Sequence, residues 1–116
     1  MKKHIFIVDS DIMNLSTVNN SLAHLYKISI CNSPDAMFKF LLRLIPDLIL
    51  LNIDMTKSDK SEVLKNHELY KKIPVILMVP SYISEKQIKY IEKGAAYFVY
   101  LPFNNSYLIE LIEKYI

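Results

Sequence analysis

The chain has 116 residues, of which 52% are hydrophobic and 22% are charged, and its formal net charge is +2. This length fits one domain over residues 1–116, and this composition excludes a disordered chain. The mild charge argues against nucleic acid as a partner, and no apolar stretch reaches the roughly 20 residues that cross a bilayer. We therefore expect a globular cytoplasmic domain that binds neither nucleic acid nor a membrane.

Short apolar runs alternate with segments of helical periodicity along the whole chain, which predicts βα units and a parallel sheet. Strands are expected at residues 5–8, 28–31, 48–51, 75–79 and 98–101. The first, third and fourth are apolar without alternation, as in strands that are buried on both faces, whereas Ser29 interrupts the second and suggests a sheet edge. Right-handed crossovers then give a doubly wound α/β sheet.

Five helices are expected between and after these strands. We expect Ser33 to cap the second helix, Ser84 the fourth, and Asn105 or Ser106 the fifth, and we expect the fourth to end at Gly94. The expected apolar faces are, in chain order, Leu15, Val18, Leu22 and Leu25; Met37, Phe38 and Leu41; Val63 and Leu64; Ile88 and Ile91; and Leu108, Leu111, Ile112 and Tyr115.

Rare residue types exclude several kinds of site. The single cysteine, Cys31, rules out an internal disulfide, and its place in an apolar run predicts a core side chain instead of a reactive thiol. The single glycine rules out a glycine-rich phosphate loop. A histidine metal site is not expected, because no ligand spacing relates His4, His24 and His67.

Polar side chains follow the first and third predicted strands, at the edge where ligands gather in such sheets. Asp9, Asp11 and Asp54 are therefore candidate ligands for a divalent cation such as Mg²⁺. The alternative is that these aspartates only occupy loops and helix N-termini, where aspartate is common. The spacing alone favours this alternative.

The chain resembles the receiver (CheY-like) domain of two-component response regulators over nearly its whole length. Residues 5–9, 46–51, 61–65 and 73–76 are similar to the family's first strand with its acidic residue, third strand, third helix and fourth strand. Gly94-Ala95 and Pro102-Phe103 match the residues around its fifth strand. The resemblance implies a flavodoxin-like (βα)5 fold with strand order 2-1-3-4-5, a place in phosphorelay signalling, and a cis bond before Pro102.

The sequence departs from this family at the phosphoryl site. Asn52 stands where receivers have the phosphoryl-accepting aspartate, and a neutral amide is a poor nucleophile. Ser10, Val79 and Leu101 stand where the family has a metal-binding acid, a hydroxyl residue and a lysine. Because phosphoryl transfer needs a nucleophile, a metal and neutralising charge, the resemblance implies a degenerate receiver, or pseudo-receiver. Since the four positions diverge together, we predict that Asn52 is natural and not engineered.

These observations favour a signalling domain that acts by protein–protein interaction, independently of phosphorylation. Such a domain would be no enzyme and would need no cofactor. Its partner would be a histidine kinase, another signalling protein, or an effector domain in a longer chain. The alternative is an atypical Mg²⁺-dependent receiver that is phosphorylated on Asp54 or Asp9, with Asp54 facing the pocket because residues two apart in an extended chain point the same way. A small α/β enzyme outside signalling is disfavoured, because no Ser-His-Asp pattern is visible.

The resemblance also places a partner site on the fourth helix, fifth strand and fifth helix. Phe98 matches the family's aromatic switch position. Tyrosine combines apolar area with a polar tip and is enriched at interfaces, so the expected partner face includes Tyr90, Tyr97, Tyr100 and Tyr107. For any single tyrosine, the alternative is packing against a neighbouring helix.

Overall fold

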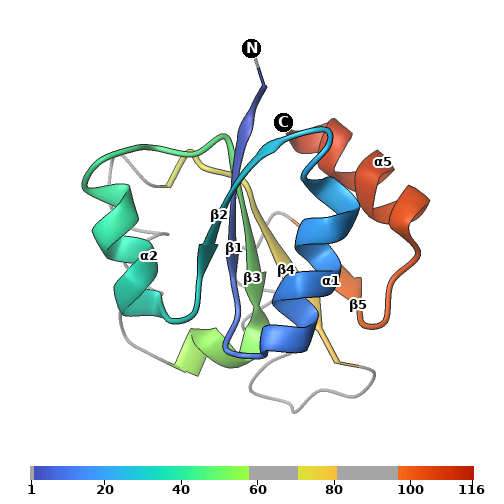
Figure 1. The fold of residues 1–116 in the computed structure, drawn as a ribbon, viewed down its shortest axis with the longest axis horizontal. Coiled ribbons are helices and arrows are strands. Elements are labelled where there is room, and N and C mark those ends of the chain that lie inside the picture. Colours follow the sequence, from blue (N-terminus) through green and yellow to red (C-terminus); the bar gives the residue numbers. More distant parts are fainter. Residues whose placement is uncertain (1, 58–70, 81–96) are drawn as a thin grey trace.

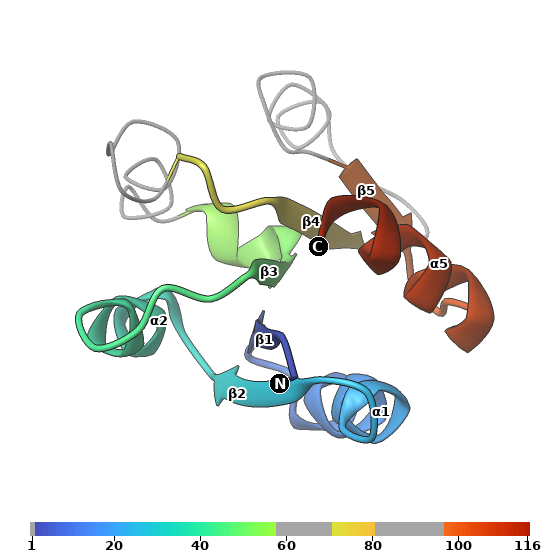
Figure 2. The ribbon, with the colours of Figure 1, turned by 90° about the horizontal axis from the view of Figure 1, so that it is seen from above.

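The computed structural model describes residues 2–57, 71–80 and 97–116. Five parallel strands form one sheet in the expected order, β2-β1-β3-β4-β5. The strands are β1 (His4–Val8), β2 (Lys27–Cys31), β3 (Leu48–Asn52), β4 (Val75–Val79) and β5 (Tyr97–Tyr100). Figures 1 and 2 show α1 (Ile12–Leu22) and α5 (Asn105–Tyr115) on one face of the sheet and α2 (Pro34–Leu41) on the other.

The core lies on both faces of the central strands. Every residue of β1 and β3 is buried, as their continuous apolar sequences predicted. β2 forms an edge of the sheet and is half-exposed, which confirms the interpretation of Ser29. Alternate residues of each strand supply two clusters: Ile5, Ile7, Leu48 and Leu50 on the α1 and α5 side, and Phe6, Val8, Ile49 and Leu51 on the α2 side.

The helix ends follow the predicted caps in part. Ser33 caps α2, and its hydroxyl accepts from the backbone N–H of Ala36 over 3.1 Å. The expected cap of α5 at Asn105 or Ser106 is wrong, because Asn104 keeps the extended backbone of a cap and its side chain accepts from the N–H of Tyr107. Asn105 instead begins the helix, and its side-chain Oδ1 accepts from the Ser21 hydroxyl of α1 over 2.8 Å.

Two further expectations concern Leu25 and the helices around residues 63–64 and 84–94. Leu25 was expected on the buried face of the first helix, but α1 ends at Leu22 and Leu25 is 41% exposed in the turn that follows. The helices expected around residues 63–64 and 84–94, and with them Tyr90, lie outside the described residues. Within the described ranges, no helix is both long enough and apolar enough to cross a bilayer.

A small polar cluster joins the beginnings of three strands. The backbone N–H of His4 donates to the carboxylate of Asp47, which precedes β3, over 2.8 Å. The His4 ring forms a hydrogen bond of 2.7 Å with the hydroxyl of Ser29 on β2. Burial of the ring and the nearby Lys27 charge lower the pKa of His4, while Asp47 opposes the shift. The cluster has a structural role, since it satisfies the hydrogen-bonding groups of buried polar residues at the amino edge of the sheet.

The Cys31 thiol provides a test of this packing. It is fully buried at the end of β2, and burial raises its pKa from 9.0 to about 11. We expect the folded protein to react with a thiolate-seeking reagent at least about 100-fold more slowly than the urea-unfolded chain at neutral pH, because the thiolate is scarce and covered. The folded state favours the neutral thiol. This contribution to stability is therefore complete below about pH 9 and is lost as the pH rises through about 11.

The matched control is a Cys31→Ala, Asn32→Cys chain, because Asn32 is exposed beside the same strand end. Its thiol should react at nearly the unfolded rate. Equal rates for the native Cys31 thiol and the Asn32→Cys thiol would contradict the burial of Cys31 at the end of β2.

Candidate functional site

The register of the sheet brings Asp9 and Asn52 together at its carboxyl edge. Val8 of β1 pairs with Leu51 of β3, so the residues that follow them, Asp9 and Asn52, lie side by side. Asp9 is 1% exposed and Asn52 is 9% exposed. The Asn52 side-chain N–H donates to Oδ2 of Asp9 over 3.1 Å. The edge therefore contains a buried carboxylate in direct contact with a buried carboxamide.

Two further donors complete the surroundings of Asp9. The backbone N–H of Asp11 donates to Oδ1 over 2.9 Å, and the side-chain amide of Asn14 donates to Oδ2. A buried carboxylate requires such partners, because an unpaired buried charge is costly. Asn14 was not selected from the sequence. The available signal was its position in the first turn of the helix that follows Asp9, one turn away from a capping residue.

The other two candidate aspartates have separate tasks. Asp11 caps α1, and its Oδ1 accepts from the N–H groups of Met13 and Asn14 over 2.9 and 3.3 Å. The alternative of a pocket-facing Asp54 depends on an extended chain, whereas the 3-10 helix η1 (Ile53–Lys57) begins directly after Asn52. The backbone N–H of Asp54 donates to Oδ1 of Asn52 over 2.9 Å, and the Asp54 side chain is exposed.

These contacts do not fit a divalent cation as arranged. Mg²⁺ requires several oxygen ligands that converge on one point. Asp11 directs its carboxylate to its own helix, and Asn52 directs its nitrogen, not its oxygen, toward Asp9. Across the described ranges, no three His, Cys, Asp or Glu side chains form a group that could hold a metal ion. The structure therefore does not bring the three candidate aspartates together as ligands.

The remaining predicted site residues surround this edge with little polar chemistry. Val79, the last residue of β4, is fully buried on the α2 side. Leu101 packs on the opposite cluster, and Ser10 is exposed. A hollow of about 450 Å³ lies beside Asn52 and is lined by Asp11, Met13, Asn14, Thr17, Asn52, Pro80, Leu101, Pro102 and Phe103. The Leu101–Pro102 peptide bond in its wall is cis, as the resemblance implied.

The family model described as the response regulator receiver domain matches residues 5–113. The chain belongs to the response regulator receiver family. No curated protein sequence matches it. The fold of this receiver domain is also that of solved structures to which its sequence is only distantly similar.

Three of these structures illustrate the likeness. The chemotaxis response regulator CheY4 of Vibrio cholerae is 16% identical, with a TM-score of 0.85 over 100% of both chains. A putative response regulator from Chloroflexus aurantiacus is 18% identical, with a TM-score of 0.88 over 98% of this chain and 97% of that one. The receiver domain of sensor histidine kinase PA1611 from Pseudomonas aeruginosa, which has a magnesium ion in its active site cleft, is 15% identical, with a TM-score of 0.86 over 99% and 98%.

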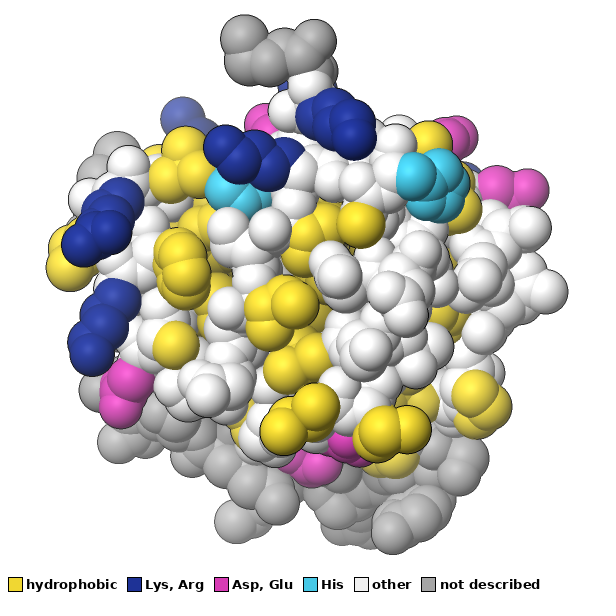
Figure 3. Space-filling view, in the orientation of Figure 1, with side chains coloured by type: hydrophobic (Ala, Val, Ile, Leu, Met, Phe, Trp, Pro, Cys, Tyr) yellow, Lys and Arg dark blue, Asp and Glu magenta, His cyan; other side chains and the backbone are white. Residues whose placement is uncertain are grey.

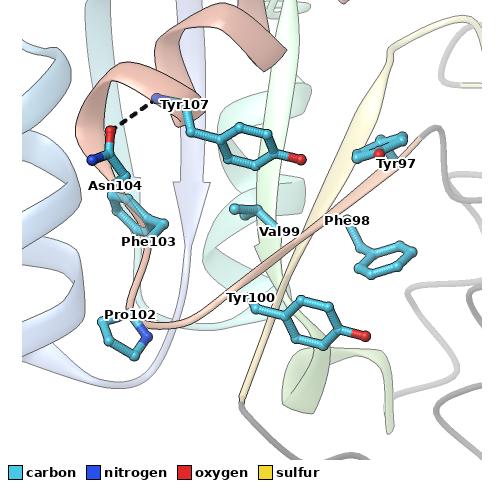
Figure 4. Close-up of a pocket in the computed structure, with 8 residues that line it drawn as sticks. All are labelled: Tyr97, Phe98, Val99, Tyr100, Pro102, Phe103, Asn104 and Tyr107. Atoms are coloured by element: carbon cyan, nitrogen blue, oxygen red, sulfur yellow. Dashed lines mark hydrogen bonds between the residues drawn. The ribbon is translucent and has the colours of Figure 1, made fainter.

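A second hollow of this receiver domain lies between β5 and α5. Its volume is about 410 Å³, and Figure 4 shows its lining: Tyr97, Phe98, Val99, Tyr100, Pro102, Phe103, Asn104 and Tyr107. Tyr97, Tyr100 and Tyr107 are 40%, 52% and 46% exposed, so the predicted face is an aromatic surface where it is described. The rings are in mutual contact: the Phe98 centroid lies 5.6 Å from that of Tyr97 and 5.3 Å from that of Tyr100.

The two ends of this hollow are joined by a polar contact. A hydrogen bond with Tyr97 raises the pKa of Tyr107, with smaller effects in the same direction from burial and from the Tyr97 charge. Figure 4 shows the Tyr107 hydroxyl, from α5, directed toward Tyr97 on β5. The contact links β5 to α5 beside the hollow, and the tyrosine rings remain partly exposed.

Replacement of Asn52 by aspartate tests the arrangement around Asp9. Asn52→Asp removes the donor at 3.1 Å and places a second carboxylate beside a buried one. We expect the free energy of unfolding to fall by roughly 1–3 kcal/mol at neutral pH without added metal. Repulsion raises the pKa of the carboxyl pair. The variant should therefore lose stability as the pH rises through this raised pKa, and it should recover fully below about pH 4, the ordinary pKa of an aspartate.

Urea unfolding of both chains over this pH range measures the effect. Asn32→Asp is the matched control, because it makes the same chemical change at an exposed position after a strand. A loss of stability that does not depend on pH, or one that the control shares, would count against a direct Asp9–Asn52 contact.

Proposed function

We propose that this receiver domain signals by protein–protein interaction, independently of phosphorylation. In this role it catalyses no phosphoryl transfer and uses no Mg²⁺. The observation that carries the proposal is the position of Asn52, at the end of β3 and in contact with the buried Asp9. The family resemblance puts the phosphoryl-accepting aspartate at this position.

The residues at the carboxyl edge of the sheet support this proposal, because they lack groups that phosphoryl transfer uses. The amide of Asn52 is a poor nucleophile, and its two polar atoms already bond to Asp9 and to the backbone of Asp54. All three donors of the Asp9 cluster are nitrogen groups, which satisfy the carboxylate without a cation. Leu101 and Val79 offer neither positive charge nor a hydrogen-bond donor from their side chains.

The aromatic hollow between β5 and α5 is the surface on which we propose that the partner docks. Three half-exposed tyrosine rings around a concave surface combine apolar contact area with hydroxyl groups at the rim. Phe98 is half-buried, packs against the α2-side cluster and contacts the rings on either side of it, so it connects this surface to the core. The proposed partner is a histidine kinase, another signalling protein, or an effector domain in a longer chain.

The competing function is Mg²⁺-dependent phosphorylation of a nearby aspartate. Asp9 is 1% exposed and is enclosed by donors, which makes it a poor acceptor. Asp54 has an exposed side chain two residues beyond Asn52, so it is the acceptor that this alternative requires. The two functions differ in a covalent product, and mass measurement separates them.

Incubation with Mg²⁺ and acetyl phosphate, followed by intact-mass measurement, tests the proposal. We expect no adduct on the natural chain and no rise in melting temperature in millimolar Mg²⁺. The chain with Ser10→Asp, Asn52→Asp, Val79→Thr and Leu101→Lys should gain both, because these changes supply the acids, hydroxyl and cation that the chemistry needs.

An acid-stable, base-labile phosphate adduct on the natural chain would overturn the proposal. If Asp54→Asn then abolished that adduct, the acceptor would be Asp54. Failure of the four-residue variant to accept phosphate while it remains folded would show that these four positions do not account for inactivity.

A further inference from the structure

The C-terminal end of α2 carries cationic and apolar side chains around a hollow. Lys39, Phe40, Leu42 and Arg43, which we name the α2 patch, line a hollow of about 340 Å³. Leu42 is 82% exposed and Phe40 is 40% exposed. Figures 1 and 2 show that α2 lies across the sheet from α5 and that this end of α2 is far from the carboxyl edge of β1 and β3. The α2 patch is thus separate from the Asp9 cluster and from the aromatic hollow.

The backbone holds the two cations of the α2 patch on one side of the helix. Leu42 keeps helical dihedral angles, and its N–H donates to the carbonyl of Phe38 over 3.2 Å. The next bond of this type, from Leu44 N–H to the carbonyl of Phe40, is 3.0 Å long. Helical geometry therefore continues past Lys39 to Arg43, and side chains four residues apart on a helix are neighbours.

The apolar part of the α2 patch is anchored in the core but not covered by it. The Phe40 ring lies 5.8 Å from the ring of Phe6, which is fully buried, so one side of Phe40 is fixed. The other side is exposed beside Leu42. The chain continues with two more exposed aliphatic residues, Leu44 at 42% and Ile45 at 45%. Exposed apolar groups that gather in this way mark interaction surfaces.

The charge of the α2 patch selects the kind of partner. Neither Lys39 nor Arg43 forms an ion pair with another described residue. The ion pair found among the described residues joins Lys3 and Asp47. Figure 3 shows Lys and Arg side chains along this side of the molecule and over the adjoining edge, with hydrophobic atoms and some Asp or Glu side chains among them. The α2 patch itself combines two cations with two apolar side chains, and such a surface is complementary to an acidic, apolar ligand.

We propose that the α2 patch docks an acidic amphipathic peptide segment of a partner protein. An aliphatic side chain of the segment enters the hollow beside Phe40 and Leu42, and its neighbouring carboxylates pair with Lys39 and Arg43. A hollow that is lined by two cations and two apolar side chains suits a single protruding side chain. A lipid bilayer, in contrast, would be met better by a convex apolar surface.

Titration of the isotope-labelled chain with two synthetic helical peptides, followed by backbone amide NMR shifts, tests this inference. One peptide carries Leu and Glu on one face, and the other replaces each Glu by Gln. We expect the Glu peptide to shift residues 39–45 and the Gln peptide to bind roughly tenfold more weakly. Arg43→Glu and Leu42→Ser should each weaken the Glu peptide to a similar extent.

Control variants make comparable changes elsewhere: Lys114→Glu reverses the charge of an exposed residue of α5, and Leu25→Ser replaces a half-exposed leucine in a turn. Neither should alter binding, and melting temperatures confirm that all variants fold.

The inference is overturned if both peptides bind equally, or if the shifts fall outside residues 39–45. It is also overturned if Arg43→Glu has no effect. Two other results would assign the surface to a different occupant: binding of phosphatidylserine vesicles in place of the peptide, or a dimer in sedimentation experiments in which the α2 patch is covered by a second copy of the chain. No result depends on phosphorylation, so the proposed function stands or falls separately.

Discussion

The carboxylate of Asp9 is buried at the carboxyl edge of the sheet, and a buried carboxylate must be surrounded by hydrogen-bond donors. β3 supplies one donor through Asn52, α1 supplies another through Asn14, and the connection between β1 and α1 supplies the backbone N–H of Asp11. These bonds fix the start of α1 and the end of β3 relative to β1. The same bonds occupy the Asp9 carboxylate, and in the function that we propose this leaves it unavailable to a cation.

The apolar residues around this edge act in the same direction. Val79 and Leu101 pack on opposite faces of the sheet, so they extend the two hydrophobic clusters to its carboxyl edge. Burial of such side chains stabilises the fold. Under the proposed function, it also leaves an apolar wall where phosphoryl transfer would need charge. In the function that we propose, the sheet edge is structural, and recognition occurs on surfaces built by β5 with α5 and by α2. The two surfaces differ in chemistry, since one is aromatic with hydroxyl groups and the other is aliphatic and cationic.

The sheet was predictable because its signals are local and strong. Continuous apolar runs identified β1, β3 and β4 as strands buried on both faces, and Ser29 correctly suggested that β2 is an edge. Caps were less certain, because several adjacent polar residues can each cap a helix. Asn104, not Asn105, has the extended backbone that a cap requires, while Asn105 contacts Ser21 on a helix distant in sequence. The alternative of a pocket-facing Asp54 relied on the alternation of an extended chain, but η1 begins immediately after β3.

By itself, the sequence determined the alternation of strands and helices, the buried faces, and the residue types at the sheet edge, because these depend on composition and on neighbours along the chain. Only the tertiary structure decided what those residue types do. The register of β1 and β3 puts Asn52 in contact with Asp9, and the first turn of α1 brings Asn14 to the same carboxylate. The helical turn after α2 sets Lys39 and Arg43 around one hollow. These contacts join separate elements or depend on local backbone geometry, and residue order alone does not specify the distances between side chains.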